Sequence, residues 1–116
     1  MFRYLALVTE IISEESILLT VDLGFGVLKI QEFRLAGIDF SEFRGTQNRE
    51  KAALIKKTLT EKLLNKEVTL KSLKSEKSGT YLAFIYMTSK ESSYNDELIA
   101  SGLVKPFIKR PLSNKQ

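Results

Sequence analysis

The sequence contains no cysteine and no histidine, and these two absences remove several kinds of chemistry. Without cysteine the chain has no disulfide bond and no thiol nucleophile. Without either residue it lacks the usual zinc ligands, and without histidine it lacks the commonest general acid or base of enzymes. Any metal ion must therefore bind through oxygen atoms.

Long apolar runs are absent as well. No stretch approaches the roughly 20 residues that a membrane-spanning helix needs, and the apolar start of the chain meets Glu10 too early for a signal peptide. The chain has 116 residues, of which 43% are hydrophobic, and this length is typical of one domain with a real core. We therefore expect a single soluble, cytoplasmic domain.

The charges are distributed unevenly along the chain. The formal net charge is +4, but residues 1–46 contain 4 Lys/Arg and 7 Asp/Glu, whereas residues 47–116 contain 14 and 7. A basic second half is able to attract a polyanion such as nucleic acid. Lysine-rich helix faces are also common as plain solvated surface, so charge alone leaves both interpretations open.

Residue patterns predict the order of the secondary structure. Residues rich in Leu, Ile, Val and Thr predict strands, a polar turn separates the first two of them, and the repeat changes to a helical period after Asn48. Gly24-Phe25-Gly26 predicts a turn between the second and third strands. We expect strands over 2–12, 16–22, 27–38, 68–71 and 81–86, and helices over 48–64 and from Ser92 or Ser93 to Ile99.

Three meandering strands, a helix and two closing strands are what a five-stranded OB-type β-barrel requires. The predicted fold is therefore mainly β (α+β), with one helix between strands three and four and one C-terminal helix. An open α+β sheet is the alternative. We expect the domain to cover residues 1–105 and a basic tail to cover 106–116.

The segment 33–42 (FRLAGIDFSE) carries the clearest chemical pattern. The carboxylate of Asp39 is a suitable ligand for a hard cation such as Ca²⁺. The carboxylate of Glu42 is able to orient or deprotonate a water molecule. Arg34 carries a guanidinium that is able to hold a phosphate oxygen. Residues of these types near a loop are also common as solvated residues or as a local ion pair, so the chemistry alone does not decide.

Three motifs in this chain resemble those of the staphylococcal nuclease-like (thermonuclease) family. Residues 33–42 are similar to its F-R-L-x-x-(V/I)-D-x-P-E signature, and Gly79 with 82–86 (LAFIY) is similar to its G-R-x-L-A-Y-I-Y strand. Residues 95–104 (NDELIASGLV) resemble its N-x-x-L-(V/I)-x-x-G-L-A helix. The three motifs occur in the family's order and cover about residues 6–108.

The resemblance assigns roles to individual residues. It implies that Arg34 and Glu42 are catalytic, acting on phosphate and water, and that Asp39 binds Ca²⁺ as the cofactor. The family's second metal aspartate lies in the first hairpin turn, where Glu15 is the matching candidate. Phe40 replaces a threonine whose backbone carbonyl helps to bind the metal, so the resemblance also makes Phe40 a carbonyl ligand.

One catalytic position of the family is altered. Thr80 follows Gly79, where the family has its second catalytic arginine. Threonine supplies no positive charge, and the loss of a preorganised donor of this kind costs about 10²–10³-fold in rate. The sequence therefore predicts reduced or altered activity, with Arg44, Arg49 or Arg110 as the residues available to replace the missing charge.

Nucleic-acid contacts are expected from three residues. Lys77 matches a phosphate-facing lysine of the family, and Tyr81 is a candidate for stacking on a base. Arg110, in the basic tail, is a candidate for contact with phosphate.

Three hypotheses remain open at this stage. The first is a Ca²⁺-dependent phosphodiesterase that acts on DNA or RNA, and the second is a catalytically inactive OB-fold module that binds nucleic acid or a protein. The third is a structural component of a larger assembly.

Overall fold

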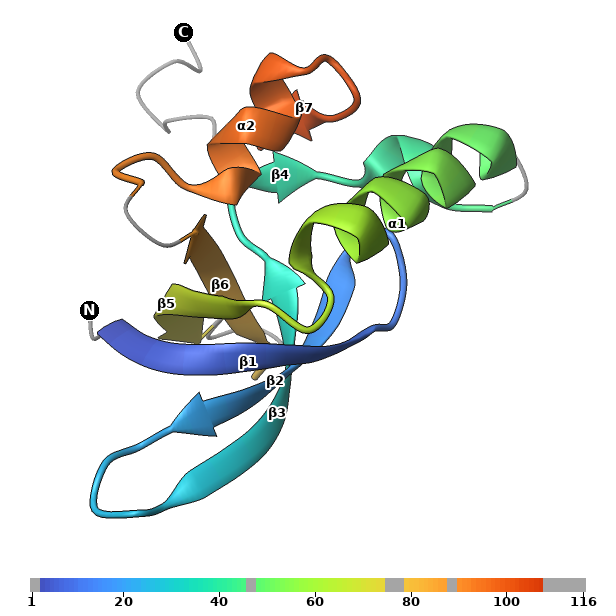
Figure 1. Cartoon of the computed structure of the whole chain (residues 1–116). Coiled ribbons are helices and arrows are strands. Elements are labelled where there is room, and N and C mark those ends of the chain that lie inside the picture. Colours follow the sequence, from blue (N-terminus) through green and yellow to red (C-terminus); the bar gives the residue numbers. More distant parts are fainter. Residues whose placement is uncertain (1–2, 46–47, 75–78, 88–89, 108–116) are drawn as a thin grey trace, which may run out of the picture.

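The computed structural model describes residues 3–45, 48–74, 79–87 and 90–107. Five strands close into a barrel, namely β1 (Arg3–Ile11), β2 (Ser16–Asp22), β3 (Leu28–Leu35), β5 (Glu67–Lys74) and β6 (Tyr81–Met87). Their order around the barrel is β1-β2-β3-β6-β5, and β1 closes the circle by pairing with β5 (Figure 1). The predicted five-stranded OB-type barrel is thus confirmed, and the open sheet is excluded.

Neighbouring strands of the barrel are antiparallel, except where β3 meets β6. That seam is parallel and contains two residue pairs, Arg34 with Leu82 and Leu35 with Ala83, whereas β2 and β3 pair along their whole length from Ser16–Arg34 to Asp22–Leu28. The side chains of a strand alternate between its two faces. Arg34 therefore lies on the outside of the barrel, between the buried side chains of Phe33 and Leu35.

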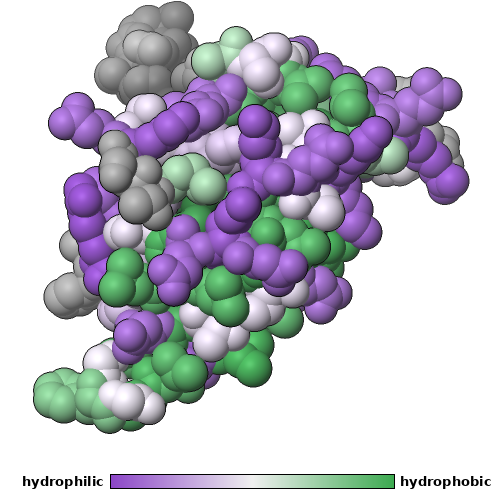
Figure 2. Space-filling view, viewed as in Figure 1, coloured by the Kyte–Doolittle hydropathy of each residue, from purple (hydrophilic) through white to green (hydrophobic). Residues whose placement is uncertain are grey.

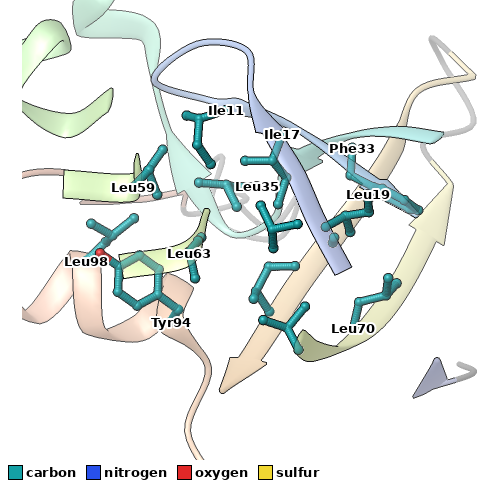
Figure 3. Packing of buried hydrophobic residues seen from close by; sticks show 14 of the residues in the cluster. Ile11, Ile17, Leu19, Phe33, Leu35, Leu59, Leu63, Leu70, Tyr94 and Leu98 are labelled. Carbon is teal, nitrogen blue, oxygen red and sulfur yellow. The ribbon is translucent and has the colours of Figure 1, made fainter. Parts of the chain in front are cut away.

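Two helices cover one end of the barrel. Helix α1 (Arg49–Leu63) lies within the predicted range of 48–64, and its residues Ile55, Leu59 and Leu63 are completely buried. They recur every four residues, so they share one face of the helix. Figure 3 shows Leu59 and Leu63 turned toward the same core as side chains from the strands.

Helix α2 (Tyr94–Ala100) begins where the sequence predicted. Ser93 is its N-cap, and the Ser93 side chain accepts a hydrogen bond from the backbone N–H of Asp96 at 3.1 Å. Tyr94 and Leu98 face the core (Figure 3). Gly102, with φ of +85°, follows the end of the helix, as expected for a glycine that stops a helix.

The predicted third strand, 27–38, is shorter in the structure. Strand β3 ends at Leu35, and the chain turns at Gly37, where φ is +78°. A Cβ atom on Gly37 would lie 3.2 Å from the ring of Phe84, so this turn needs glycine both for its conformation and for space. After the turn a two-residue strand, β4 (Ile38–Asp39), pairs with β7 (Lys105–Pro106) in a second small sheet.

Asn95, at the start of α2, holds this region together. Its side chain is 1% exposed and makes three hydrogen bonds to backbone groups. Asn95 Nδ2 donates to the carbonyls of Ala36 (2.8 Å) and Ala83 (2.9 Å), and Asn95 Oδ1 accepts from the N–H of Ile85 (2.9 Å). One buried amide therefore ties α2 to β6 and to the turn between β3 and β4.

Strand β7 spans the boundary between domain and tail that the sequence predicts after residue 105. The N–H of Phe107 also donates to the carbonyl of Gly37 at 2.9 Å. The chain is therefore held to the barrel as far as residue 107. None of the helices in the described ranges has the length and apolar character that crossing a membrane demands.

Candidate functional site

The outer end of β3 carries the first candidate residue, Arg34. Its guanidinium forms an ion pair with the carboxylate of Glu15, in which Arg34 Nη2 donates to Glu15 Oε2. The side chains of Arg34 and Glu15 are 38% and 26% exposed, so water screens the pair only in part. The guanidinium fork has five N–H donors, and this bond uses one of them.

Backbone contacts hold Glu15 in this position. The carbonyl of Glu15 accepts a hydrogen bond from the N–H of Leu35 at 2.9 Å, and the next residue, Ser16, pairs with Arg34 in the β2–β3 ladder. The N–H of Glu15 donates to the hydroxyl oxygen of Ser13 at 3.2 Å. The first hairpin turn is therefore fixed onto the end of β3, and the Glu15 carboxylate lies beside Arg34 as a consequence.

Asp39 ends β4 and is accessible to solvent. Its Oδ1 accepts a hydrogen bond from the backbone N–H of Ser41 at 2.9 Å. Hydrogen bonds from Ser41 lower the pKa of Asp39 below its usual value of 3.8, and the positive charges of Lys105 and Arg44 lower it further. Asp39 is therefore a firmly ionised carboxylate.

Glu42 lies in the short 3-10 helix η1 (Ser41–Phe43), and its two carboxylate oxygens differ. Glu42 Oε2 is 3.6 Å from Nζ of Lys51 on α1. Glu42 Oε1 is buried and has no hydrogen-bond donor among the described residues. A buried carboxylate oxygen without a donor is costly, so this atom is a strong acceptor for a water or for another donor that enters the site.

Local contacts fix the backbone around Glu42. Asn48 Nδ2 donates to the carbonyl of Glu42 at 2.9 Å. Asn48 is the N-cap residue of α1 with φ of +61°, and its side chain makes no hydrogen bond that caps the helix. Lys51 Nζ also lies 5.9 Å from the centre of the Phe43 ring. The loop between β4 and α1 thus presents Glu42 from a defined position.

Phe40, the predicted carbonyl ligand, has its side chain in the core. The side chain is 6% exposed, and its ring packs against that of Phe43 with 6.3 Å between centres. The carbonyl of Phe40 accepts a hydrogen bond from the N–H of Phe43 at 3.0 Å. A carbonyl oxygen has two lone pairs, so one remains for a cation.

Residues 3–45, 48–74, 79–87 and 90–107 contain no group of three or more carboxylates gathered to hold a metal ion. Oxygen ligands of the kind that Ca²⁺ prefers are present at Asp39 and Phe40. The third predicted ligand, Glu15, is engaged with Arg34. The ligand types suit Ca²⁺, but their arrangement in this structure does not form a ready site.

The remaining predicted residues lie toward β6. Thr80 directly precedes this strand and is partly buried. Tyr81 is also partly buried, and its ring meets that of Phe33 edge-on with 6.1 Å between centres. Lys74 Nζ lies 5.7 Å from the centre of the Tyr81 ring. Lys77 and Arg110 lie outside the described residues.

Two residues of this region were not singled out from the sequence as parts of the site. Lys51 pairs with Glu42, and nothing in its helical pattern distinguishes it from the other lysines of α1. Asn95 was quoted as the first residue of a motif without a role. A polar residue in the first turn of an amphipathic helix, two residues after its N-cap Ser93, was the available signal for a buried anchor.

Comparison with known proteins supplies the identity. Residues 32–116 match the family described as staphylococcal nuclease homologue, and the match includes Arg34, Asp39, Glu42 and Asn95. The chain belongs to this family. Membership, which the motifs predicted, points to nucleic acid as the substrate or partner of this staphylococcal nuclease homologue. The curated proteins contain no match to the chain.

Proposed function

We propose that the protein hydrolyses phosphodiester bonds of nucleic acid, with Arg34 binding the phosphate and Glu42 acting as the general base. The observation that carries this proposal is the buried Oε1 atom of Glu42, which lacks a hydrogen-bond donor among the described residues. An acceptor of this kind is suited to a water molecule whose proton it takes.

In the proposed reaction, the oxygen of a water molecule attacks phosphorus and a new P–O bond forms. The proton of that water moves to the Glu42 carboxylate, and the bond between phosphorus and the leaving sugar oxygen breaks. Solvent water protonates the leaving oxygen, since the chain has no histidine to do so. Arg34 donates hydrogen bonds to the non-bridging oxygens, on which negative charge accumulates.

The proposed rate is low because the family's second arginine is missing. Thr80 occupies that position, and the loss of one preorganised cationic donor costs about 10²–10³-fold. Arg44 and Arg49 are both exposed, and we propose them as candidates to supply the missing charge. Lys77, Tyr81 and Arg110 are proposed as further nucleic-acid contacts.

For Ca²⁺ we propose weak binding at Asp39, the Phe40 carbonyl and Glu15. Asp39 supports this because its lowered pKa keeps the carboxylate ionised. When bound, the cation would neutralise charge on the phosphate. No step of the mechanism above depends on it, since the three ligands are not gathered.

The second candidate function is binding of nucleic acid without cleavage. The pairing of Arg34 with Glu15 favours it over hydrolysis, because a guanidinium that is partly neutralised gives less stabilisation to the charge of a transition state. The replacement of arginine by Thr80 favours it as well. Cleavage of a phosphodiester bond separates this candidate from the first.

The deciding experiment measures cleavage of single-stranded DNA and of RNA by the purified protein, with Ca²⁺ and with a chelator. Glu42→Gln removes the proposed base, and Glu50→Gln makes the same change at an exposed position in the first turn of α1. Cutting that Glu42→Gln loses and Glu50→Gln keeps supports hydrolysis. Salt-sensitive binding of nucleic acid without cleavage supports the binding module. If Arg34→Ala and Glu42→Gln both cleave nucleic acid as fast as the wild type does, the proposed mechanism is wrong.

A further inference from the structure

The outer surface of the β1–β2–β3 sheet carries four exposed aliphatic side chains. Leu5 and Leu7 on β1 are 64% and 38% exposed, and Leu28 and Ile30 on β3 are 64% and 67% exposed. The strand register aligns Leu5, Asp22 and Leu28 in one row across the sheet. Leu7, Thr20 and Ile30 form the next row. We call these four aliphatic residues the aliphatic face.

The β2–β3 hairpin extends this apolar surface beyond the barrel (Figure 1). Leu23 and Val27 are 43% and 51% exposed, and Phe25, at the tip, is completely exposed. Figure 2 shows hydrophobic colouring concentrated at this end of the molecule. Monomeric soluble proteins expose single apolar residues but seldom a contiguous set of this kind, which usually marks an interaction site.

Hydrogen bonds within the hairpin stabilise the conformation of its tip. The N–H of Leu23 donates to the carbonyl of Val27 and the N–H of Val27 to that of Gly24, each at 2.9 Å. The N–H of Gly24 donates to Asp22 Oδ1 at 2.8 Å. Because these backbone groups are satisfied within the turn, they do not oppose transfer of the tip from water into an interface.

A hollow of about 260 Å³ opens in the aliphatic face. It is lined by Leu5, Ala6, Leu7, Thr20, Asp22, Leu28 and Glu67. The apolar part of this lining is able to bind one apolar side chain of a partner. A buried anchor of this kind contributes most of the binding energy in many interfaces. Asp22 and Glu67 place two carboxylates at the same hollow, so a cation adjacent to the anchor would meet them.

Carboxylates also surround the rest of the face. Glu67 is paired with Leu7 across β1–β5, and Glu10 and Glu32 flank Leu18 in the row beyond Leu7 and Ile30. All three glutamates and Asp22 are exposed. At the far end of β1, Arg3 and Lys71, which is paired with it on β5, provide two positive charges. The border of the aliphatic face is therefore predominantly acidic.

This charge distribution selects among possible occupants. Phosphates of nucleic acid and anionic lipids would meet four carboxylates, which repel them. A second copy of the chain packing the same face against itself would oppose carboxylate to carboxylate, because a two-fold interface uses one patch twice. A protein segment that carries apolar side chains between positively charged ones complements both the apolar face and its acidic border.

We propose that the aliphatic face and its hairpin tip dock a protein segment whose apolar side chains are flanked by lysine or arginine. One apolar side chain of the partner enters the hollow between Leu5 and Leu28, and its cations pair with Asp22 and Glu67. This function is separate from the proposed hydrolysis, since neither Arg34 nor Glu42 takes part in it.

The test uses a fluorescent synthetic peptide of alternating leucine and lysine as the probe. Binding to the whole protein is measured by anisotropy, alongside a peptide with serine in place of leucine and one with glutamate in place of lysine. We expect the leucine–lysine peptide to bind at least about tenfold more tightly than either control. Absence of binding, or equal binding of the serine–lysine peptide, would overturn the proposal.

Variants locate the binding on the surface. The double variant Leu5→Ser with Ile30→Ser and the double variant Asp22→Asn with Glu67→Gln should each weaken the leucine–lysine peptide about tenfold. Leu54→Ser removes a leucine of α1 that is 48% exposed and should change nothing. Equal weakening by Leu54→Ser would contradict the assignment.

Sedimentation velocity supplies a second readout. If the protein sediments as a monomer at every concentration, the result agrees with the proposal. If it dimerises and Ile30→Ser abolishes the dimer, the occupant of the aliphatic face is a second copy of the chain and the proposal is wrong. Cleavage or binding of nucleic acid should be the same in wild type and in the Leu5/Ile30 variant. A failure of the proposed hydrolysis therefore leaves this result unaffected.

Discussion

Glu15 and Arg34 are joined by an ion pair of their side chains, and the hydrogen bond from the N–H of Leu35 to the carbonyl of Glu15 holds the backbone of Glu15 beside this end of β3. The residue expected to bind a cation therefore neutralises the residue expected to bind an anion. Phosphate must compete with Glu15 for the guanidinium of Arg34.

Glu15→Gln removes this competitor and should increase the affinity for single-stranded DNA in the absence of metal by about three- to tenfold, because the guanidinium regains its full charge for phosphate. Fluorescence anisotropy at fixed salt measures the change. Glu14→Gln alters the net charge equally at the neighbouring residue. If both variants gain the same affinity, overall charge and not the Glu15–Arg34 pair is responsible.

Thr80→Arg should raise the rate of cleavage, if hydrolysis is the function, by about 10²-fold, because it supplies a cationic donor for the developing charge on phosphate. Initial rates on single-stranded DNA give the comparison. Thr58→Arg adds the same charge on α1 and serves as the control. A Thr80→Arg protein that binds more tightly but cuts no faster would argue for the binding module.

Replacing Asn95 by alanine removes its hydrogen bonds to the carbonyl of Ala36 and the N–H of Ile85, and leaves the carbonyl of Ala83 with its other donor, the N–H of Ala36. Because buried groups left unpaired cost about 1–3 kcal/mol each, we expect the free energy of unfolding to fall by about 3 kcal/mol. Urea denaturation measures it. Asp96→Ala, at the adjacent exposed residue of α2, should cost much less, and a similar loss in both variants would contradict the role of Asn95.

Tyr94 makes stability depend on pH in the alkaline range. Burial, assisted by the charge of Glu97, raises the pKa of Tyr94 from 10.0 to about 12. The neutral phenol is favoured in the folded state, so its contribution is complete below pH 10 and is lost as the pH rises toward 12.

Urea unfolding of the wild type at pH 9 and pH 11 should show this loss, and Tyr94→Phe should show less of it because it has no phenol to ionise. Absorbance at alkaline pH reports the ionisation directly. Identical pH dependence of stability in wild type and Tyr94→Phe would rule out this residue as the cause.

Periodic patterns predicted the barrel and both helices because each element buries a regular stripe of side chains. The two-residue strands β4 and β7 were not predicted, since two residues show no period and their pairing joins Ile38 to Pro106 across most of the chain. At the turn that ends β3, a Cβ atom on Gly37 would crowd the ring of Phe84, a neighbour from a distant part of the chain that no local pattern contains.

Motif spacing identified Arg34, Asp39 and Glu42 as candidates but not their partners. Arg34 meets Glu15 from the preceding hairpin, and Glu42 meets Lys51 from the following helix. Such pairings arise from the three-dimensional approach of separate elements. For the same reason the sequence suggested Glu15 as a metal ligand without indicating that a guanidinium lies beside it.

The parallel seam between β3 and β6 has a kinetic meaning. Its two residue pairs join parts of the chain that are far apart in sequence. Closing the barrel at this seam therefore costs the conformational entropy of a large loop, and the seam itself contributes few contacts. The hairpins on either side are able to persist while this seam separates. The amide of Ala36, which donates across the seam to Ala83, should exchange with solvent sooner than those of Ile17 and Leu19. Arg34 lies on β3 at this seam, so any opening of the barrel there would move the guanidinium away from β6.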